Sequence, residues 1–101
     1  MKQSEMLENA AQAADLLKVM ANKHRLIILC VLNDRELSVS EINQQIAIPQ
    51  STLSQHLAVL RKDGLVQTRR EAQSIFYSLS SDQVKTIIAT LHHLYCADYI
   101  P

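Results

Sequence analysis

The stretch Gln50–His56, written QSTLSQH, decides how the whole chain is interpreted. It opens an amphipathic helix that continues as LAVLRKDGL, and six of its seven residues carry a hydroxyl, an amide or an imidazole without a full charge. A solvated helix face is normally built from charged residues instead. Base edges in the DNA major groove present neutral donors and acceptors, which Gln, Asn, Ser, Thr, His and Arg side chains read. The stretch therefore predicts a helix that contacts nucleobases.

The residues around this stretch predict a helix-turn-helix over about 38–63. Ser38 and Glu41 form a capping-box pattern that opens a short helix. The segment Ala47-Ile48-Pro49 interrupts it, because the residue before a proline is pushed out of helical geometry. A second helix then runs from about Gln50 to Asp63, and Gly64 follows as its left-handed C-cap. Its buried face carries three leucines, Leu53, Leu57 and Leu60.

A β-hairpin follows, over about residues 65–79. The runs LVQTRR and SIFYSLS flank Glu71-Ala72-Gln73. In the second run Ile75, Tyr77 and Leu79 alternate with Ser74 and Ser78, as in a half-buried strand, and only Phe76 breaks the alternation. Ser80, three residues before Gln83, is expected to cap a last helix with one apolar face. A hairpin after a helix-turn-helix is typical of a wing.

Two further helices are predicted before the helix-turn-helix. The first has a narrow apolar stripe of Met6, Ala10, Ala13, Leu17 and Met20, in alternating steps of four and three. A stripe this narrow more often meets another helix than a broad core. The second, RLIILCVLN after Asn22, is apolar almost all round and must be buried. The predicted fold is therefore mainly α with a β-hairpin wing, a winged helix-turn-helix in the order α-α-α-α-β-β-α, forming one domain over 1–101.

This fold predicts which residues meet double-stranded DNA, because the second helix of a helix-turn-helix lies in the major groove. On that helix the uncharged candidates are Gln50, Ser51, Thr52, Ser54, Gln55 and His56. Arg61 and Lys62 at the helix end would lie beside the backbone, and Arg69 and Arg70 near the hairpin tip would reach phosphates or a minor groove. The alternative is that the stretch is only a helix N-terminus, where Ser and Thr act as caps. That accounts for one or two of the six polar residues.

Composition limits the function classes further. Ten Lys and Arg balance ten Asp and Glu, so net charge does not by itself indicate nucleic acid. The longest apolar run, Leu26–Leu32, is far below the roughly 18 residues that span a bilayer. We expect a soluble, cytoplasmic protein with no membrane partner. A single glycine leaves no phosphate-binding loop, and no nucleophile–base–acid set is suggested, so no catalytic residues and no enzyme activity are expected.

Several segments resemble the ArsR/SmtB family of dimeric bacterial repressors, and within it the HlyU/BigR/SqrR branch. They are LLKVMANKHRLIILCVL, ELSVSEI, STLSQHLAVLRKDGLVQTRREAQSIFYSLS and LHHLYC, which together cover about residues 13–96. The resemblance implies a homodimer through the first and last helices. It also implies that Cys30 and Cys96 match two thiols which reactive sulfur species or oxidants link as a disulfide or polysulfide, so that DNA is released.

The residues leave several alternatives open. Two cysteines are too few for a disulfide scaffold, and in a reducing compartment they are either buried hydrophobes or redox-active thiols; Cys30 inside LIILCVL looks like the former. The metal-binding Cys-Val-Cys of founding family members reads Ser38-Val39-Ser40 here, and a hydroxyl is a poor ligand for a soft metal. We therefore expect no metal and no cofactor, although a metal-responsive repressor remains an alternative. Some branch members displace a DNA-coating protein, so an anti-silencer is a further alternative to a repressor.

Overall fold

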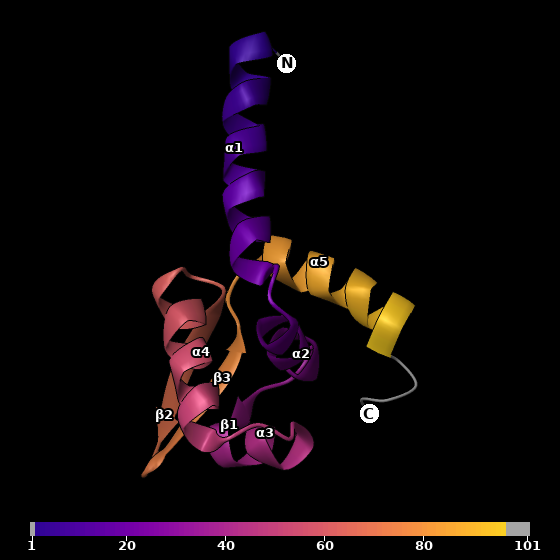
Figure 1. Ribbon diagram of the computed structural model, residues 1–101. Coiled ribbons are helices and arrows are strands. Elements are labelled where there is room, and N and C mark those ends of the chain that lie inside the picture. The colour runs from indigo at the N-terminus through magenta and orange to yellow at the C-terminus, as the bar shows by residue number, and fades with distance from the viewer. Residues whose placement is uncertain (1, 97–101) are drawn as a thin grey trace.

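The computed structural model describes the backbone of residues 2–96 and the side chains of residues 2–95. Five α-helices, three short strands and a terminal π-helical turn follow one another in the described part of the chain (Figure 1). Their bounds are α1 Gln3–Met20, α2 Lys23–Val31, β1 Leu37–Ser38, α3 Val39–Gln45, α4 Gln50–Lys62, β2 Val66–Glu71, β3 Ser74–Leu79, α5 Asp82–Leu91 and η1 His92–Cys96. None of the described helices is long and apolar enough to cross a membrane. The predicted winged helix-turn-helix is confirmed.

The core lies where α2, α3, α4 and α5 meet the small sheet. Asn22 caps α2 by accepting hydrogen bonds from the backbone N–H groups of His24 and Arg25, and this helix then contributes four consecutive buried residues, Ile28–Val31. The three leucines predicted for the buried face of α4 are all at most 1% exposed. The predicted core-facing sides of α2 and α4 are therefore confirmed.

Helix α1 stands away from this core for most of its length (Figure 1). Only Met20 of this helix is buried, while Met6 is 56% and Leu17 is 52% exposed. The predicted apolar stripe exists, but most of it is uncovered in the single chain. The predicted dimer through α1 and α5 stays a prediction.

The turn between α3 and α4 is held by a side chain that the sequence did not single out. Asn43 Nδ2 donates hydrogen bonds to the carbonyl oxygens of Ile46 and Ile48, at 3.3 Å and 2.9 Å. The capping box predicted at the start of α3 is present in both halves, with Ser38 Oγ accepting from Glu41 N–H and Glu41 accepting from Ser38 N–H. Together these bonds set how α4 leaves the turn.

Replacing Asn43 with alanine is expected to lower the free energy of unfolding by about 1–3 kcal/mol, because two partly buried carbonyls lose their donor. DNA affinity should fall as well, since the angle of α4 depends on this turn. Urea denaturation and operator titration measure both effects. Gln44→Ala, at the exposed neighbouring position, is the matched control and should stay within about 0.5 kcal/mol of the unchanged chain. Equal stability of the two variants would contradict this role.

The end of α4 explains why the single glycine lies where it does. Gly64 has a φ of +81°, a conformation that L side chains rarely adopt. Its N–H donates to Arg61 O at 3.1 Å and the N–H of Leu65 donates to Leu60 O at 2.8 Å, which is the Schellman pattern. The predicted left-handed glycine at the helix end is confirmed. It turns the chain from α4 into the wing.

The wing contains one strand more than predicted. The strand order is β1-β3-β2, with all pairs antiparallel, and Leu37 of β1 pairs with Tyr77 of β3. A two-residue strand is too short to show an alternating pattern in the sequence, so only its pairing reveals it. On β3 the predicted alternation holds near the base, where Leu79 is buried, and fades toward the tip, where Ile75 is 40% exposed.

One prediction about α5 is wrong. Its N-cap is Ser81, whose Oγ accepts from Val84 N–H, and not Ser80. Ser80 Oγ donates to the Gly64 carbonyl and so ties the end of the hairpin to the end of α4. After Leu91 the helix widens into the π-helical turn η1.

Candidate nucleic-acid interface

The outer edge of α4 carries hydrogen-bonding groups that the fold itself leaves uncommitted. Gln50, Ser51, Ser54 and Gln55 are exposed, and Thr52 is half-buried. The N-cap is Pro49, and within residues 2–95 none of these five side chains makes a hydrogen bond. Capping therefore does not explain the polar stretch. What remains is a row of neutral donors and acceptors facing outward from a helix anchored by its leucines.

His56 lies one turn after Thr52, at the border between that row and the buried face of the helix. It is half-buried, and its ring meets the His24 ring of α2 edge-on, with centroids 5.7 Å apart. Burial lowers the pKa of His56, and the neighbouring Arg25 and His24 lower it further. The imidazole is therefore mainly neutral at pH 7. The structure gives it a contact between α2 and α4, and its predicted role in DNA binding remains a prediction.

The cations at the other end of α4 are separated from the polar row. Arg61 and Lys62 are exposed in the last turn. Arg61 lies eleven residues after Gln50, roughly 16 Å further along the axis at 1.5 Å per residue. Positive charge at a helix C-terminus is also favoured by the helix dipole. The arrangement suits base contacts at one end of α4 and phosphate contacts at the other.

The two arginines of the wing lie in different surroundings. Arg69 Nε donates to both carboxylate oxygens of Glu36, at 3.1 Å and 3.2 Å, and Arg69 Nη1 donates to Glu71 Oε2 at 3.0 Å. Its guanidinium also lies over the Phe76 ring, 5.0 Å from the centroid. Hydrogen bonding to Glu36 and then to Glu71 raises the pKa of Arg69, and hydrogen bonding to Arg69 lowers the pKa of Glu36. Arg70 is exposed and forms no ion pair within residues 2–95.

Glu36 was missed by the sequence reasoning. It lies 33 residues from Arg69 along the chain, in the turn before the unpredicted strand β1. No local pattern connects two residues so far apart. Only the pairing of β1 with β3 brings the carboxylate beside the wing.

Cys30 lies at the inner wall of an apolar hollow between α2 and the C-terminal helix. Its residue is 3% exposed, and the hollow, of about 350 Å³, is otherwise lined by Lys23, Leu26, Ile27, Leu91 and Tyr95. Cys96 ends the turn η1, and its side chain lies outside the described residues. The predicted pairing of the two thiols therefore stays a prediction. Burial of Cys30 in the core is compatible with the alternative of an ordinary hydrophobe.

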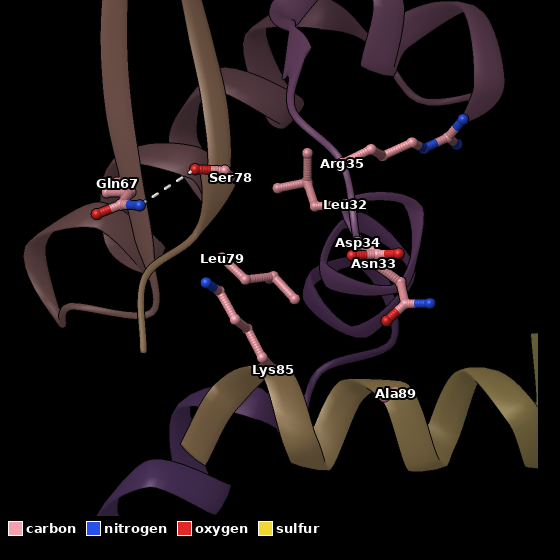
Figure 2. A pocket seen from close by; sticks show the side chains of 9 residues that line it. All are labelled: Leu32, Asn33, Asp34, Arg35, Gln67, Ser78, Leu79, Lys85 and Ala89. Carbon is pink, nitrogen blue, oxygen red and sulfur yellow. Dashed lines mark hydrogen bonds between the residues drawn. The ribbon is translucent and has the colours of Figure 1, made fainter. Parts of the chain in front are cut away.

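A second, more polar hollow of about 400 Å³ lies between the α2–β1 turn, the base of the hairpin and α5 (Figure 2). Lys85 reaches toward it from α5, and Gln67 donates to Ser78 across the hairpin at 3.4 Å. None of the residues predicted for DNA binding or redox sensing lines it. Its hairpin residues Gln67 and Ser78 lie two positions from Arg69 and Phe76 in the sheet register.

Comparison with known proteins places this geometry in a family. Residues 22–68 match the family model described as bacterial regulatory protein, arsR family. The transcriptional activator HlyU of Vibrio cholerae is 58% identical over 96 residues, which cover 95% of this chain and 89% of that protein. The chain belongs to the ArsR family. It is a DNA-binding transcriptional regulator.

Solved structures of the same family share the fold. Reduced HlyU from Vibrio cholerae has a TM-score of 0.86 and 60% identity, covering 91% of this chain and 97% of that chain. The transcriptional repressor BigR from Xylella fastidiosa has a TM-score of 0.90 and 39% identity, covering 99% of each chain. The resemblance to the ArsR/SmtB family and to its HlyU/BigR branch is thereby confirmed.

Proposed function

We propose that this chain is a homodimeric repressor that reads operator DNA with the outer edge of α4 and leaves it when Cys30 and Cys96 become linked. The observation that carries the proposal is the row of exposed, uncharged and uncommitted side chains on α4. Water alone would favour charged residues there. Base edges in a major groove bond neutral donors and acceptors of this kind.

Individual contacts follow from side-chain chemistry. Gln55 is suited to a bidentate contact with adenine, while Gln50, Ser51, Thr52 and Ser54 bond base edges or nearby phosphates. Arg61, Lys62 and Arg70 are exposed cations placed for the phosphate backbone. His56 contributes from its contact with His24, by supporting the helix or by reaching the groove edge.

Dimerisation through α1 and α5 is supported by the apolar surface that the single chain leaves open. Met6, Leu7 and Leu17 on α1 are exposed, as are Leu94 and Tyr95 after α5. Exposed apolar residues clustered on two helices are typical of an interaction surface. A two-fold dimer would present its two α4 helices about 34 Å apart, the spacing of successive major grooves on one face of DNA.

The proposed inducer is a reactive sulfur species or an oxidant. With a persulfide, one thiolate attacks the sulfane sulfur and releases the donor thiol; the second thiolate then attacks the new cysteine persulfide, forming the disulfide and releasing hydrosulfide. With peroxide, a sulfenic acid forms first and the second thiol displaces water from it. Linking α2 to the C-terminal turn would tilt the two α4 helices away from their groove spacing. The apolar hollow at Cys30 supports this as a route for small reagents.

Activation of transcription is a second candidate function beside repression. One relative is named a transcriptional activator, and relatives from Xylella fastidiosa and Agrobacterium fabrum are named biofilm growth-associated repressors. An activator of this fold can act as an anti-silencer by displacing a DNA-coating protein. Transcription on bare promoter DNA separates the two, because a repressor lowers it unaided whereas an anti-silencer acts only when the coat is present.

Purified, fully reduced protein tests the proposal as a whole. We expect a dimer in sedimentation and selection of a two-fold symmetric site from random duplexes at moderate salt. Treatment with persulfide or peroxide should release the site, and intact-mass measurement identifies the sulfur species formed. A monomer with no preference for any duplex would overturn the proposal.

A further inference from the structure

We propose that Glu36 limits the non-specific DNA affinity of the wing: it holds Arg69 on the outward face and withholds that cation from contacts with DNA phosphates. The inference rests on the proposed DNA-reading function and goes beyond it, because it assigns a role to a carboxylate that never touches DNA. It also gives Arg69 and Arg70 different roles, although their neighbouring positions in the sequence suggest that both contact DNA.

The sheet register places the members of this cluster on one face. Phe76 of β3 pairs with Ser38 of β1 on one side and with Arg69 of β2 on the other. Glu36 lies two residues before Ser38, so its side chain emerges on the same face as Phe76. The Arg69 guanidinium therefore spans the strands over the Phe76 ring and meets both oxygens of Glu36. This two-point contact fixes the orientation of the guanidinium as well as its position.

Arg70 projects from the opposite face. It pairs with Ile75, and that face continues through Thr68 and Tyr77 to the buried pair Val66 and Leu79. This is the face from which the hairpin packs against the helical core. At the hairpin tip this face is exposed, so Arg70 lies outside the cluster that holds Arg69.

Glu36 is presented by a turn that is itself fixed. Asp34 adopts a φ of 57°, and Arg35 Nε donates to the Val31 carbonyl at 2.7 Å. Arg35 Nη2 also donates to Gln45 Oε1 at 2.6 Å, which joins the turn to the end of α3. The backbone that carries Glu36 is therefore fixed, so forming the pair orders only the two side chains.

The charges on this face do not favour DNA. One arginine faces two carboxylates, Glu36 and Glu71, so the cluster carries a formal charge of −1. Both members of the Glu36–Arg69 pair remain partly exposed, with side-chain exposures of 39% and 50%, so salt and phosphates can compete for the arginine. Exposed pairs contribute little to stability. The expected consequence of the cluster therefore concerns binding rather than folding.

Non-specific affinity depends on the number of phosphate contacts, and each contact adds about 0.9 to the slope of log affinity against log salt. We expect Glu36→Gln to free Arg69 from its two-point contact, leaving only the bond to Glu71, and to steepen this slope for random duplex DNA by about 0.9. Between about 50 and about 200 mM salt, the variant should then lose about 3.5-fold more affinity than the unchanged chain. Operator affinity should rise by a comparable factor, because a phosphate contact reads no sequence.

Four further variants make the test specific. Glu36→Gln combined with Arg69→Gln should behave like Arg69→Gln alone, because no cation remains to be released. Arg69→Lys keeps the charge and loses the two-point geometry, so it should steepen the salt slope as Glu36→Gln does. It replaces Glu36→Gln in the test if that variant folds poorly. Asp63→Asn removes an exposed carboxylate at the end of α4, away from the cluster, and is the matched charge control.

The outcomes separate this inference from the function on which it rests. If Glu36→Gln changes affinity equally with and without Arg69, or no more than Asp63→Asn does, simple charge removal is the cause and the inference is overturned. If the unchanged, reduced protein prefers no duplex at all, the proposed function fails instead. A steeper slope that requires Arg69 supports the inference.

Discussion

Cys30→Ser is expected to abolish the response of operator binding to persulfide and peroxide. Coupling between a sensing site and a binding site typically changes affinity by about 5–150-fold. In the unchanged protein we expect release of that size on oxidation, and in the variant a ratio of oxidised to reduced affinity of about 1. The reason is stoichiometric: the chain has two cysteines, so removing one leaves no intramolecular partner for the other. Fluorescence anisotropy with labelled operator, before and after treatment, measures the ratio.

The controls address the burial of Cys30. Serine would place a hydroxyl in the core, where Cys30 is 3% exposed, so Cys30→Ala is made in parallel to avoid a new polar group. Cys96→Ser should lose the response equally, and intact-mass spectra should show no intramolecular bridge in any of these variants. Release of operator by oxidised Cys30→Ala would leave Cys30 as an ordinary core residue and end the sensor proposal.

Gln55→Ala is expected to reduce discrimination between operator and random duplex by about 5–150-fold, which corresponds to about 1–3 kcal/mol for one bidentate base contact. The side chain is exposed on α4 and makes no hydrogen bond within the described part of the chain. Folding should be unaffected or slightly favoured, since alanine is the better helix former. The measurement is a pair of titrations, operator and random, at one salt concentration.

A second glutamine provides the matched comparison for this variant. Gln83 is exposed in the first turn of α5, away from the outer edge of α4, and Gln83→Ala should leave discrimination unchanged. The affinity for random DNA should be similar in the unchanged chain, Gln55→Ala and Gln83→Ala, because phosphate contacts provide most of that affinity. Unchanged discrimination in Gln55→Ala, with the fold intact, would show that this side chain does not read a base.

Much of the fold was predictable because its signals are local. The capping box at Ser38, the proline before α4 and the glycine after it each act within a few residues, and each was found where it was expected. The cap of α5 was misplaced by one residue because Ser80 and Ser81 are equally good candidates by type. Ser80 bonds instead to the carbonyl of Gly64, a partner 16 residues away that decides between them.

The candidate site likewise has one part that the local sequence predicts and another that distant contacts decide. The uncharged edge of α4 is a property of seven consecutive residues, and its outward position follows from the leucines between them. His56 and Arg69 were placed by helix position and by hairpin position alone. His24 lies 32 residues from His56 and brings the His56 ring against α2. Glu36 lies 33 residues from Arg69 and holds the Arg69 guanidinium on the wing.

By itself, the sequence determined the winged helix-turn-helix, the polar edge of its reading helix and the two cysteines, because periodicity, capping and composition act over one or two helical turns. Only the tertiary structure decided that a two-residue strand joins the wing, that Arg69 is bound while Arg70 is open, and that Cys30 borders an apolar hollow. Those features depend on which distant residues the packed core brings together. Such contacts leave no periodic trace in a single chain.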